Sequence, residues 1–585
     1  MSDLPTRHSK RPIACPAWLS LGLLVVMGVL TCRESNAQNR ANSADTLQNL
    51  SADFWAWRAT NAPFTGDDVP RIERLGGKRD WSGASIAQRR RDLEMFESRW
   101  ARLKTAESSL AQQVDSELVG SALARVRWEL DVNPRWKRDP TFYIEQTLTP
   151  LLEWIAVPGP FDERRSREIL QRLDNIPSII QAARENLSKP PAPFVRAAIR
   201  SLSEIQAQLR AMAVSLEPET TLKPAALMAA VGRAIGSLEQ FRSWLQILLP
   251  SCPERFAIGR EAYSFFLHRV ALLPYSPEEL LAIGRQEAER AIAFGRFEAQ
   301  RDEGLPDLAL LPNTGAWVEK ERQDESAVRD FLKRHNLLSV PGWVQHYTFR
   351  PTPKYVEALS SFGETDDFTS ATRLKENATR YVDPPSENLD FFWQATAKDP
   401  RPILVHEGVP GHYLQLALSW ANEDPVRRHF YDSAPNEGLG FYCEEMLLQS
   451  GLFDDSPRTR EIVYKFMLLR AIGIELDVRM AMGDFTIEQG ATFLDKESGL
   501  GLTMATAGAT MFAEWPGVAM AYQTGKTDIV RFLADSKRKQ GPAFDLRTFH
   551  DFVWKNGNVP IALQRLEYLG SADDIERVHE LSKSQ

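Results

Sequence analysis

Long stretches of one-sided apolar patterning constrain this chain more than any other feature of its sequence. From about residue 51 to residue 301, apolar residues recur at steps of three and four, most clearly in residues 166–187, 193–216 and 224–249. This period is typical of amphipathic helices packed against a core. The segment SPEE at residues 276–279 combines a capping residue, a proline at the first helical position and a returning carboxylate, which predicts a helix start. The first half of the chain is therefore predicted to be helical almost throughout.

Between about residue 305 and residue 402 the sequence changes character. Prolines cluster in this stretch, and the aromatic segments at residues 344–349 and 389–393 have the composition of extended chain. Helical patterning returns from residue 403 to the C-terminus and includes the capping box TIEQ at residues 486–489. A small sheet with connecting loops is therefore expected to interrupt the helices.

The length of the chain bears on its domain organisation. At 585 residues it exceeds the size at which one hydrophobic core usually stops growing. We expect a mainly α-helical, two-lobed protein, with an N-terminal helical region at residues 38–335 and a second region at residues 336–585 that holds the sheet and the C-terminal helices. A central cleft is expected over residues 340–450. The formal net charge of −8, with no clustered basic stripe, argues against a nucleic-acid partner.

The N-terminus has the pattern of an export signal. Basic residues precede a short apolar run at residues 17–31, and the small residues Ser35 and Ala37 follow it. Residues 1–37 are predicted to be a signal peptide, which leaves an exported, periplasmic or secreted chain with no membrane span. Two alternatives are a lipid anchor on Cys32 and an uncleaved membrane anchor.

The segment HEGVPGH at residues 406–412 carries the residues of a metal site. A hydrolytic zinc site needs two neutral imidazoles, a neighbouring carboxylate that accepts a proton from water, and a third ligand that leaves one position open. His406 and His412 are six residues apart instead of the usual four. On a straight helix this spacing places them about 120° out of register. Pro410 and Gly411 break the helix, and a bulge there is expected to bring His412 back towards His406.

Glu437 is the expected third ligand. It lies 25 residues after His412, about where glutamate-type zinc peptidases take a ligand from a following helix. Glu444 and Glu445 are the alternatives. Cys443 is a soft ligand on the same predicted helix, but a single thiol between carboxylates is more often a small buried residue. Zinc is the preferred ion for two imidazoles and one carboxylate with an open position. The expected ligands are His406, His412 and Glu437.

Four blocks of the sequence together resemble the bacterial family known as domain of unknown function 885. They are HEGVPGHYLQ at 406–415, NEGLGFYCEE at 436–445, YQTGK at 522–526 and FDLRTFHDFVWKNGNVP at 544–560. Members of that family are similar to helical gluzincin peptidases such as carboxypeptidase Taq, angiotensin-converting enzyme and the oligopeptidases. The resemblance implies a two-lobed helical gluzincin-like fold with a central cleft, a small sheet near the metal site and one zinc ion per chain.

The chain departs from the family pattern at two places. Family members commonly carry tryptophan where this chain has Leu439, so the wall beside the ligand Glu437 is altered. A histidine that is frequent in the family near Ala481 is absent from residues 477–484. Any role for that position is therefore in doubt.

The resemblance also points to residues that contact the substrate. Helical zinc peptidases often stabilise the oxyanion with tyrosine or histidine, and Tyr522 and His550 lie in the matched C-terminal blocks. Each is equally well explained by a structural role. Lys526 or Arg547 is a weaker candidate for holding a substrate carboxylate. Residues 389–393 are either an edge strand on which an extended peptide lies or a buried aromatic strand.

These observations predict an exported zinc-dependent metallohydrolase, preferably a peptidase that cleaves short peptides. Glu407 is the expected general base, which takes a proton from a water activated by zinc. Two alternatives are a metallohydrolase of a non-peptide amide or ester, and a catalytically inactive exported binding protein.

Overall fold

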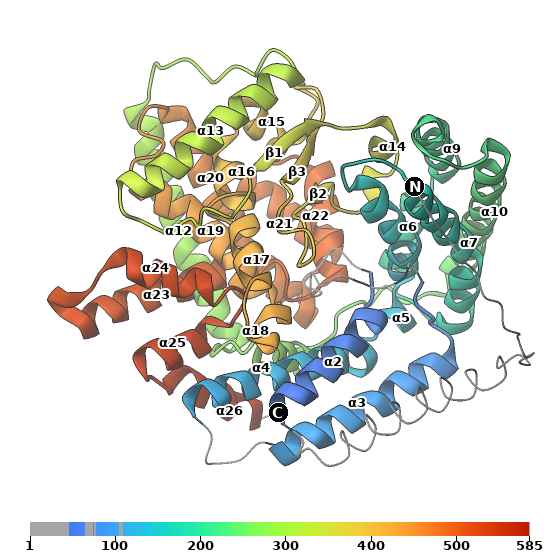
Figure 1. Ribbon diagram of the computed structural model, residues 1–585, viewed down its shortest axis with the longest axis horizontal. Coiled ribbons are helices and arrows are strands. Elements are labelled where there is room, and N and C mark those ends of the chain that lie inside the picture. Colours follow the sequence, from blue (N-terminus) through green and yellow to red (C-terminus); the bar gives the residue numbers. More distant parts are fainter. Residues whose placement is uncertain (1–45, 65–73, 75, 77, 104–108, 584–585) are drawn as a thin grey trace, which may run out of the picture. The chain divides into compact units, whose positions relative to one another are not determined.

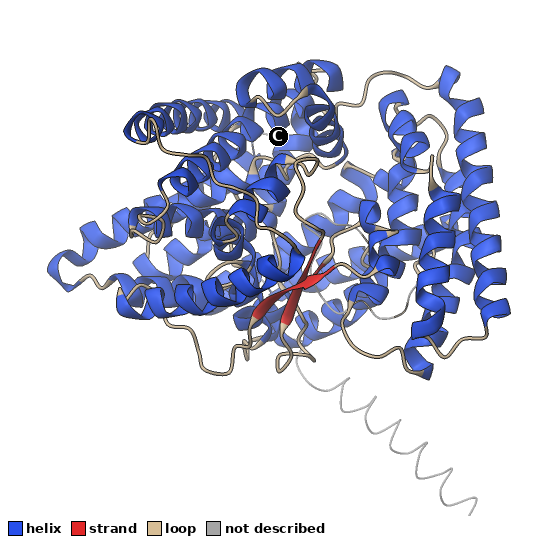
Figure 2. Ribbon diagram, turned by 90° about the horizontal axis from the view of Figure 1, so that it is seen from above, coloured by secondary structure: helices blue, strands red, loops and turns tan. Residues whose placement is uncertain are grey.

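Helices dominate the computed structural model, which describes residues 46–64, 74, 76, 78–103 and 109–583. Within that part of the chain the β-structure consists of one three-stranded sheet. Figure 2 shows these short strands in red among the helices. The prediction of a mainly α-helical protein with a small sheet is therefore confirmed. The predicted signal peptide and Cys32 lie outside the described residues.

The helices of the first part of the chain start where local chemistry predicts. The hydroxyl of Ser276 accepts the Glu279 N–H, and the Glu279 side chain returns to the Ser276 N–H, so a helix begins at Pro277. The helices before the sheet are α2 (Leu47–Asn61), α3 (Gly83–Leu103), α4 (Leu110–Arg127), α5 (Arg135–Arg138), α6 (Pro140–Ala156), α7 (Glu163–Asn186), α8 (Ala192–Ser201), α9 (Ile205–Leu216), α10 (Pro224–Leu248), α11 (Arg260–Phe265), α12 (Pro277–Arg301) and α13 (Thr314–Arg334).

Helices α6, α7, α9 and α10 pack around an apolar core and gather on the right of Figure 1. Leu173 and Ile176 from α7 meet Leu238 and Phe241 from α10 in that core, and all four side chains are fully buried. Their spacing along each helix is the three- and four-residue step seen in the sequence. We call these four helices the apolar bundle.

The sheet comprises β1 (Tyr347–Pro351), β2 (Asp366–Asp367) and β3 (Ala378–Val382). The strand order is β1-β3-β2, with β1 parallel and β2 antiparallel to β3. Extended structure was predicted at residues 344–349, and β1 overlaps that segment. Tyr347 and Phe349 point into a core shared with Trp317 of α13 and with the helices that follow the sheet.

The strand predicted at residues 389–393 is wrong. The carboxylate of Asp390 accepts the Trp393 N–H and caps a helix, α15, that begins at Phe391. The aromatic residues that looked like a strand therefore form the first turn of a short helix.

The remaining helices carry the four sequence blocks quoted above from the second half of the chain. Thr486 and Gln489 form the predicted capping box at the start of α21. These helices are α14 (Lys354–Glu357), α15 (Phe391–Lys398), α16 (Arg401–Glu407), α17 (His412–Trp420), α18 (Pro425–His429), α19 (Ser433–Gln449), α20 (Pro457–Met482), α21 (Ile487–Ser498), α22 (Leu502–Glu514), α23 (Ala521–Gln540), α24 (Leu546–Lys555), α25 (Ile561–Leu569) and α26 (Asp573–Lys583).

Residues Leu47–Gln585 form one compact unit. The boundary expected at residues 335 and 336 falls directly after α13 and stays a prediction. No helix in the described part of the chain is both long enough and apolar enough to cross a membrane.

Candidate metal centre

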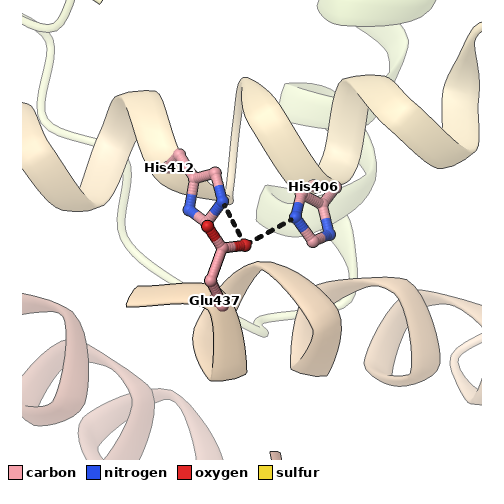
Figure 3. Close-up of side chains that lie close together, drawn as sticks. All are labelled: His406, His412 and Glu437. Carbon is pink, nitrogen blue, oxygen red and sulfur yellow. Dashed lines mark hydrogen bonds and ion pairs between the residues drawn. The ribbon is translucent and has the colours of Figure 1, made fainter. Parts of the chain in front are cut away.

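The two histidines of the HEGVPGH segment lie on two different helices. His406 is the penultimate residue of α16, and His412 is the first residue of α17. The helical structure is interrupted between them at residues 408–411, where a cis peptide bond precedes Pro410. The break replaces the bulge expected from the sequence and solves the same problem, because it turns the second imidazole back towards the first (Figure 3).

Glycine is required at the break for steric reasons. A Cβ atom at Gly411 would lie 1.7 Å from the carbonyl oxygen of His406, and one at Gly408 would lie 2.8 Å from that of Leu404. The indole of Trp554 donates to the Pro410 carbonyl at 2.6 Å and holds the turn from the α24 side. The start of α16 is fixed separately, because the Asp399 carboxylate accepts both the Arg401 N–H and the Thr459 hydroxyl.

Glu437 on α19 faces both imidazoles (Figure 3). Its Oε2 lies 3.2 Å from His412 Nε2 and 3.5 Å from His406 Nε2. The three ligand atoms lie within 4.8 Å of one another, as a group that could hold a metal ion. Both histidines are buried and Glu437 is partly buried. The structure thus brings together the three residues expected as ligands.

Glycines let α19 approach this group closely. A Cβ atom at Gly440 would lie 2.9 Å from His412 Cε1 and 3.0 Å from His406 Nε2. On the opposite side, a Cβ at Gly438 would lie 2.4 Å from the Cα of Gly525 on α23. Helix α19 is therefore held between the imidazoles and α23 with no room for larger residues.

Glu444 supports His406 from behind. Its Oε1 lies 2.7 Å from His406 Nδ1, and Arg470 lies 3.4 Å from the same carboxylate oxygen. A carboxylate that accepts the Nδ1 proton leaves the lone pair of the ring on Nε2, which is the atom that faces Glu437. Glu444 was an alternative ligand in the sequence, but its position is that of a partner to a ligand.

The other alternative ligands also have different surroundings. Glu445 forms an ion pair with Lys526 at 2.8 Å and a second with Arg290. Cys443 is fully buried, as expected for a small core residue. Lys526 and Arg547, the weaker candidates for holding a substrate carboxylate, both have protein partners. Lys526 forms an ion pair with Glu445, and Arg547 donates to Ser339 and Asn336 at the surface.

The electrostatics of the group favour positive charge at His406. Burial disfavours a charged His406, but the hydrogen bonds that its ring donates to Glu437 and Glu444 outweigh it and raise the pKa of His406 to about 9. Burial likewise disfavours the Glu437 carboxylate, yet His412 and His406 hold its pKa well below the usual range. Two imidazoles and a carboxylate concentrated in this way also suit a divalent cation.

Most of the chain matches one described family. The family described as "Bacterial protein of unknown function (DUF885)" matches residues 70–566. The chain belongs to the DUF885 family. No curated protein matches its sequence.

Two solved structures share the fold of this DUF885 chain. One is described as "a putative lipoprotein of unknown function from Shewanella oneidensis", with 18% identity and a TM-score of 0.68 over 90% of this chain and 100% of that chain. The other is described as "the putative lipoprotein from Colwellia psychrerythraea", with 18% identity and a TM-score of 0.65 over 86% of this chain and 92% of that chain. Neither description names a peptidase, so the gluzincin-like part of the expected fold stays a proposal.

The two residues expected to stabilise an oxyanion lie in different places. The ring of Tyr522, the second residue of α23, is stacked against His406 with 6.4 Å between ring centres. His550 is fully buried, with Nε2 at 2.8 Å from the Tyr442 hydroxyl and Nδ1 at 2.7 Å from the Leu337 carbonyl. Burial lowers the pKa of His550 to about 4. Both ring nitrogens of His550 therefore already have protein partners, whereas the Tyr522 ring lies next to a candidate ligand.

Glu407 is the last residue of α16. It lies beside the histidines but is not part of the candidate ligand group. It lines a cavity of about 350 Å³ together with Arg380, Asp366 and Trp393. Burial disfavours its charge, but His412, His406 and Arg380 lower the pKa of the Glu407 carboxyl. A larger cavity of about 660 Å³ shares the wall formed by Asp366 and extends to Phe368, whose ring contacts His412.

A buried polar chain that sequence reasoning missed fixes α17 against α19. Gln415 donates to the carbonyls of Pro435 and Gly557, and Asn436 donates to the Gln415 side chain at 2.7 Å. The Tyr431 hydroxyl completes the chain by donating to Asn436. The signal was available, since Gln415 lies one turn after His412 and Asn436 directly precedes Glu437. These contacts set the distance between two of the candidate ligands.

Proposed function

We propose that this protein is a zinc-dependent hydrolase that cleaves amide bonds in short peptides. The observation that carries the proposal is the convergence of His406, His412 and Glu437, whose ligand atoms lie within 4.8 Å of one another. The carboxylate of Glu444 behind His406 supports it, because metal-binding histidines regularly donate their second nitrogen to a carboxylate. Three protein ligands leave the fourth position of a tetrahedral zinc ion open for chemistry.

When bound, zinc would supply a Lewis acid that polarises the scissile carbonyl and makes water more acidic. The Glu407 carboxylate accepts the proton of the attacking water and then passes it to the nitrogen of the leaving amine. The Tyr522 hydroxyl donates a hydrogen bond to the carbonyl oxygen as negative charge develops there. Glu444 keeps the His406 ring in one orientation throughout.

The cavity lined by Glu407 and the larger cavity that reaches Phe368 support a short, extended substrate. Each is of the size that holds a few amino-acid residues, and they meet at Asp366. A gluzincin-like arrangement, with a cleft between helical lobes, belongs to the same proposal. Substrates of this size fit the cavities better than folded proteins do.

We also propose that the protein is exported. The leader pattern at residues 1–37 supports this, and the two solved structures are each described as a "putative lipoprotein", which draws attention to Cys32. Fractionation of cells that express the wild type and Cys32→Ser separates the two routes. A lipid anchor predicts that only the wild type is in the membrane fraction, whereas simple cleavage after Ala37 predicts both chains in the soluble exported fraction.

Metal content is the first test of the proposed function. We expect about one zinc ion per chain in the purified wild type and little in His406→Ala. His335→Ala, which removes an exposed histidine at the end of α13, is the matched control and should keep its zinc. If zinc is absent from the wild type even after it is added back, the metal centre and the enzyme proposal both fail.

Turnover is the second test, with a peptide library beside a panel of small amides and esters. Glu407→Gln should keep its zinc and lose hydrolysis, while Glu423→Gln at an exposed position should behave as wild type. Hydrolysis of the small amides or esters alone would show that the substrate of this site is not a peptide. Bound zinc with no hydrolysis of any panel would identify a binding protein.

A further inference from the structure

Arg380 is a charged residue near the metal centre to which the proposed function gives no role. It lies on β3, directly opposite Asp366 of β2 in the sheet register. Its Nη1 donates to Asp366 Oδ2 at 2.7 Å, and the Tyr347 hydroxyl of β1 donates to the same oxygen at 3.0 Å. All three strands of the sheet therefore contribute to holding this guanidinium.

The same guanidinium reaches the carboxylate beside the candidate ligands. Arg380 Nη1 lies 3.7 Å from Glu407 Oε1, and the guanidinium carbon lies 4.7 Å from the centre of the Trp393 ring. Arg380 thus sits between two carboxylates and over an indole, and its side chain is 13% exposed. The residues that surround it line the cavity of about 350 Å³ next to Glu407.

Glu407 needs an external partner because of its place in the chain. It is the last residue of a seven-residue helix and is followed by Gly408, so α16 offers it no later helical neighbour. His406 directly precedes it and His412 begins the next helix, and both imidazoles attract its charge. A carboxylate free to turn towards them would join the ligand group and fill the position that hydrolysis needs open.

We infer that Arg380 is a positioning residue that holds the Glu407 carboxylate out of the ligand set and directed at the attacking water. The inference rests on the proposed function, since it assigns Glu407 the role of proton acceptor. It also gives the small sheet a purpose. Strand β2 has only two residues, and the register of β2 and β3 places the carboxylate of Asp366 where it fixes Arg380.

A role as an anchor for a substrate carboxylate fits the contacts less well. The positive charge of Arg380 is already offset by Asp366 and Glu407, and little of its surface reaches the cavity. An anionic group entering there would meet two carboxylates near the one guanidinium. Loss of Arg380 should therefore affect the chemical step more than substrate binding.

The test compares Arg380→Met with Arg380→Lys and with a matched control, Arg350→Met. Arg350 lies on β1 of the same sheet, is exposed and lines neither of the two cavities. For the peptide identified by the library screen, we expect Arg380→Met to lower kcat by up to about 100-fold with KM within about twofold, because misplacement of a reacting group has costs of that size. Arg380→Lys should recover part of the loss, and Arg350→Met should match the wild type.

Two further measurements separate positioning from substrate binding. In a Glu407→Gln background, Arg380→Met should change neither the residual turnover nor the calorimetric Kd of the peptide, because Arg380 acts through Glu407. Crystal structures of the wild type and Arg380→Met, each soaked with zinc, should place the Glu407 carboxylate nearer the histidines in the variant. An unchanged kcat, a raised Kd or a Glu407 side chain that stays in place would each overturn the inference.

The outcomes also distinguish this inference from the proposed function. A wild type without Glu407-dependent turnover would contradict the proposed function alone. The crystallographic comparison would still decide whether Arg380 restrains Glu407. Conversely, a zinc-dependent peptidase whose Arg380→Met variant keeps full kcat would leave the function standing and remove the role of Arg380.

Discussion

The apolar bundle differs from the four helices α16, α17, α19 and α23, which we call the metal-centre layer because they surround the candidate metal ligands. Both regions are buried and helical, yet their helices pack in opposite ways. In the bundle of α6, α7, α9 and α10, contacts are made by large aliphatic side chains such as Leu173 and Leu238. In the layer of α16, α17, α19 and α23, the closest contacts involve glycines such as Gly438 and Gly525, and polar side chains are buried in numbers. One region fills the space between its helices with large side chains, and the other omits side chains at defined points so that its helices approach closely.

The difference shows what each region can tolerate. Helix positions in the bundle depend on total apolar volume, which several combinations of residues can supply. Helix positions in the metal-centre layer must bring three ligand atoms within 4.8 Å of one another, and the steric room for that is provided by single glycines. Substitutions in the apolar bundle should therefore change the free energy of unfolding without changing metal binding. Substitutions in the metal-centre layer should change metal binding as well.

The largest effect on stability is expected from Leu238→Ala in the bundle. The side chain is fully buried between α7 and α10, so its truncation leaves a cavity and should lower the free energy of unfolding by about 2–5 kcal/mol. Zinc content at low temperature should stay at the wild-type level. Denaturant unfolding and metal analysis of the same preparation measure both. Loss of zinc in a folded Leu238→Ala protein would show that the two regions are not separable.

Gly438→Ala makes the opposite kind of change, in the metal-centre layer. The added methyl group would lie 2.4 Å from the Cα of Gly525, so α19 or α23 must shift, at a cost of about 1–3 kcal/mol. Because the neighbouring Glu437 and Tyr522 lie on these two helices, we expect weaker zinc binding as well. Chelator competition and thermal unfolding provide the readouts. A variant with wild-type zinc affinity would mean that the metal-centre layer accommodates added side-chain volume as easily as the apolar bundle does.

The sequence predicted the parts of both regions that depend on local chemistry. The helix starts at Ser276 and Thr486 follow from capping boxes, and the convergence of the three candidate ligands agrees with what the types and order of residues around His406 predict. Residues 389–393 were misassigned because their aromatic composition fits a strand, whereas Asp390, which directly precedes the aromatic residues 391–393, caps a helix.

Contacts between distant segments could not be read in this way. Whether Glu444 binds a metal or supports His406 depends on which face of α19 it occupies relative to α16. The pairing of Arg380 with Glu407 depends on a sheet register between a two-residue strand and β3. His550 matched a sequence block, but its partners Tyr442 and Leu337 come from two other segments. Local pattern identifies the residues, and tertiary packing assigns their roles.

Glu444→Gln tests whether polar support in the metal-centre layer acts on the metal. The amide keeps the shape of the side chain but loses the charge that orients His406, so zinc affinity should fall by about 10- to 100-fold, or ~1.4–2.7 kcal/mol. Competition with a chelator of known affinity measures the change. Glu325→Gln, which alters a buried carboxylate beside the sheet, serves as the control. Equal affinities for the wild type and Glu444→Gln would reduce Glu444 to a purely structural partner.

Gly232→Ala completes the comparison with the smallest expected effect and the opposite sign to Gly438→Ala. Gly232 lies in the middle of α10 at an exposed position, and a Cβ atom there would have no neighbour within 4 Å. Alanine restricts the unfolded chain and favours the helix, so it should raise the free energy of unfolding by about 0.5–1 kcal/mol without changing zinc affinity. The same chemical change thus stabilises one region and disrupts the other, because glycine is incidental in the bundle and sterically required beside the metal centre. A destabilised Gly232→Ala protein would contradict that distinction, and paired denaturant titrations of the two variants can decide it.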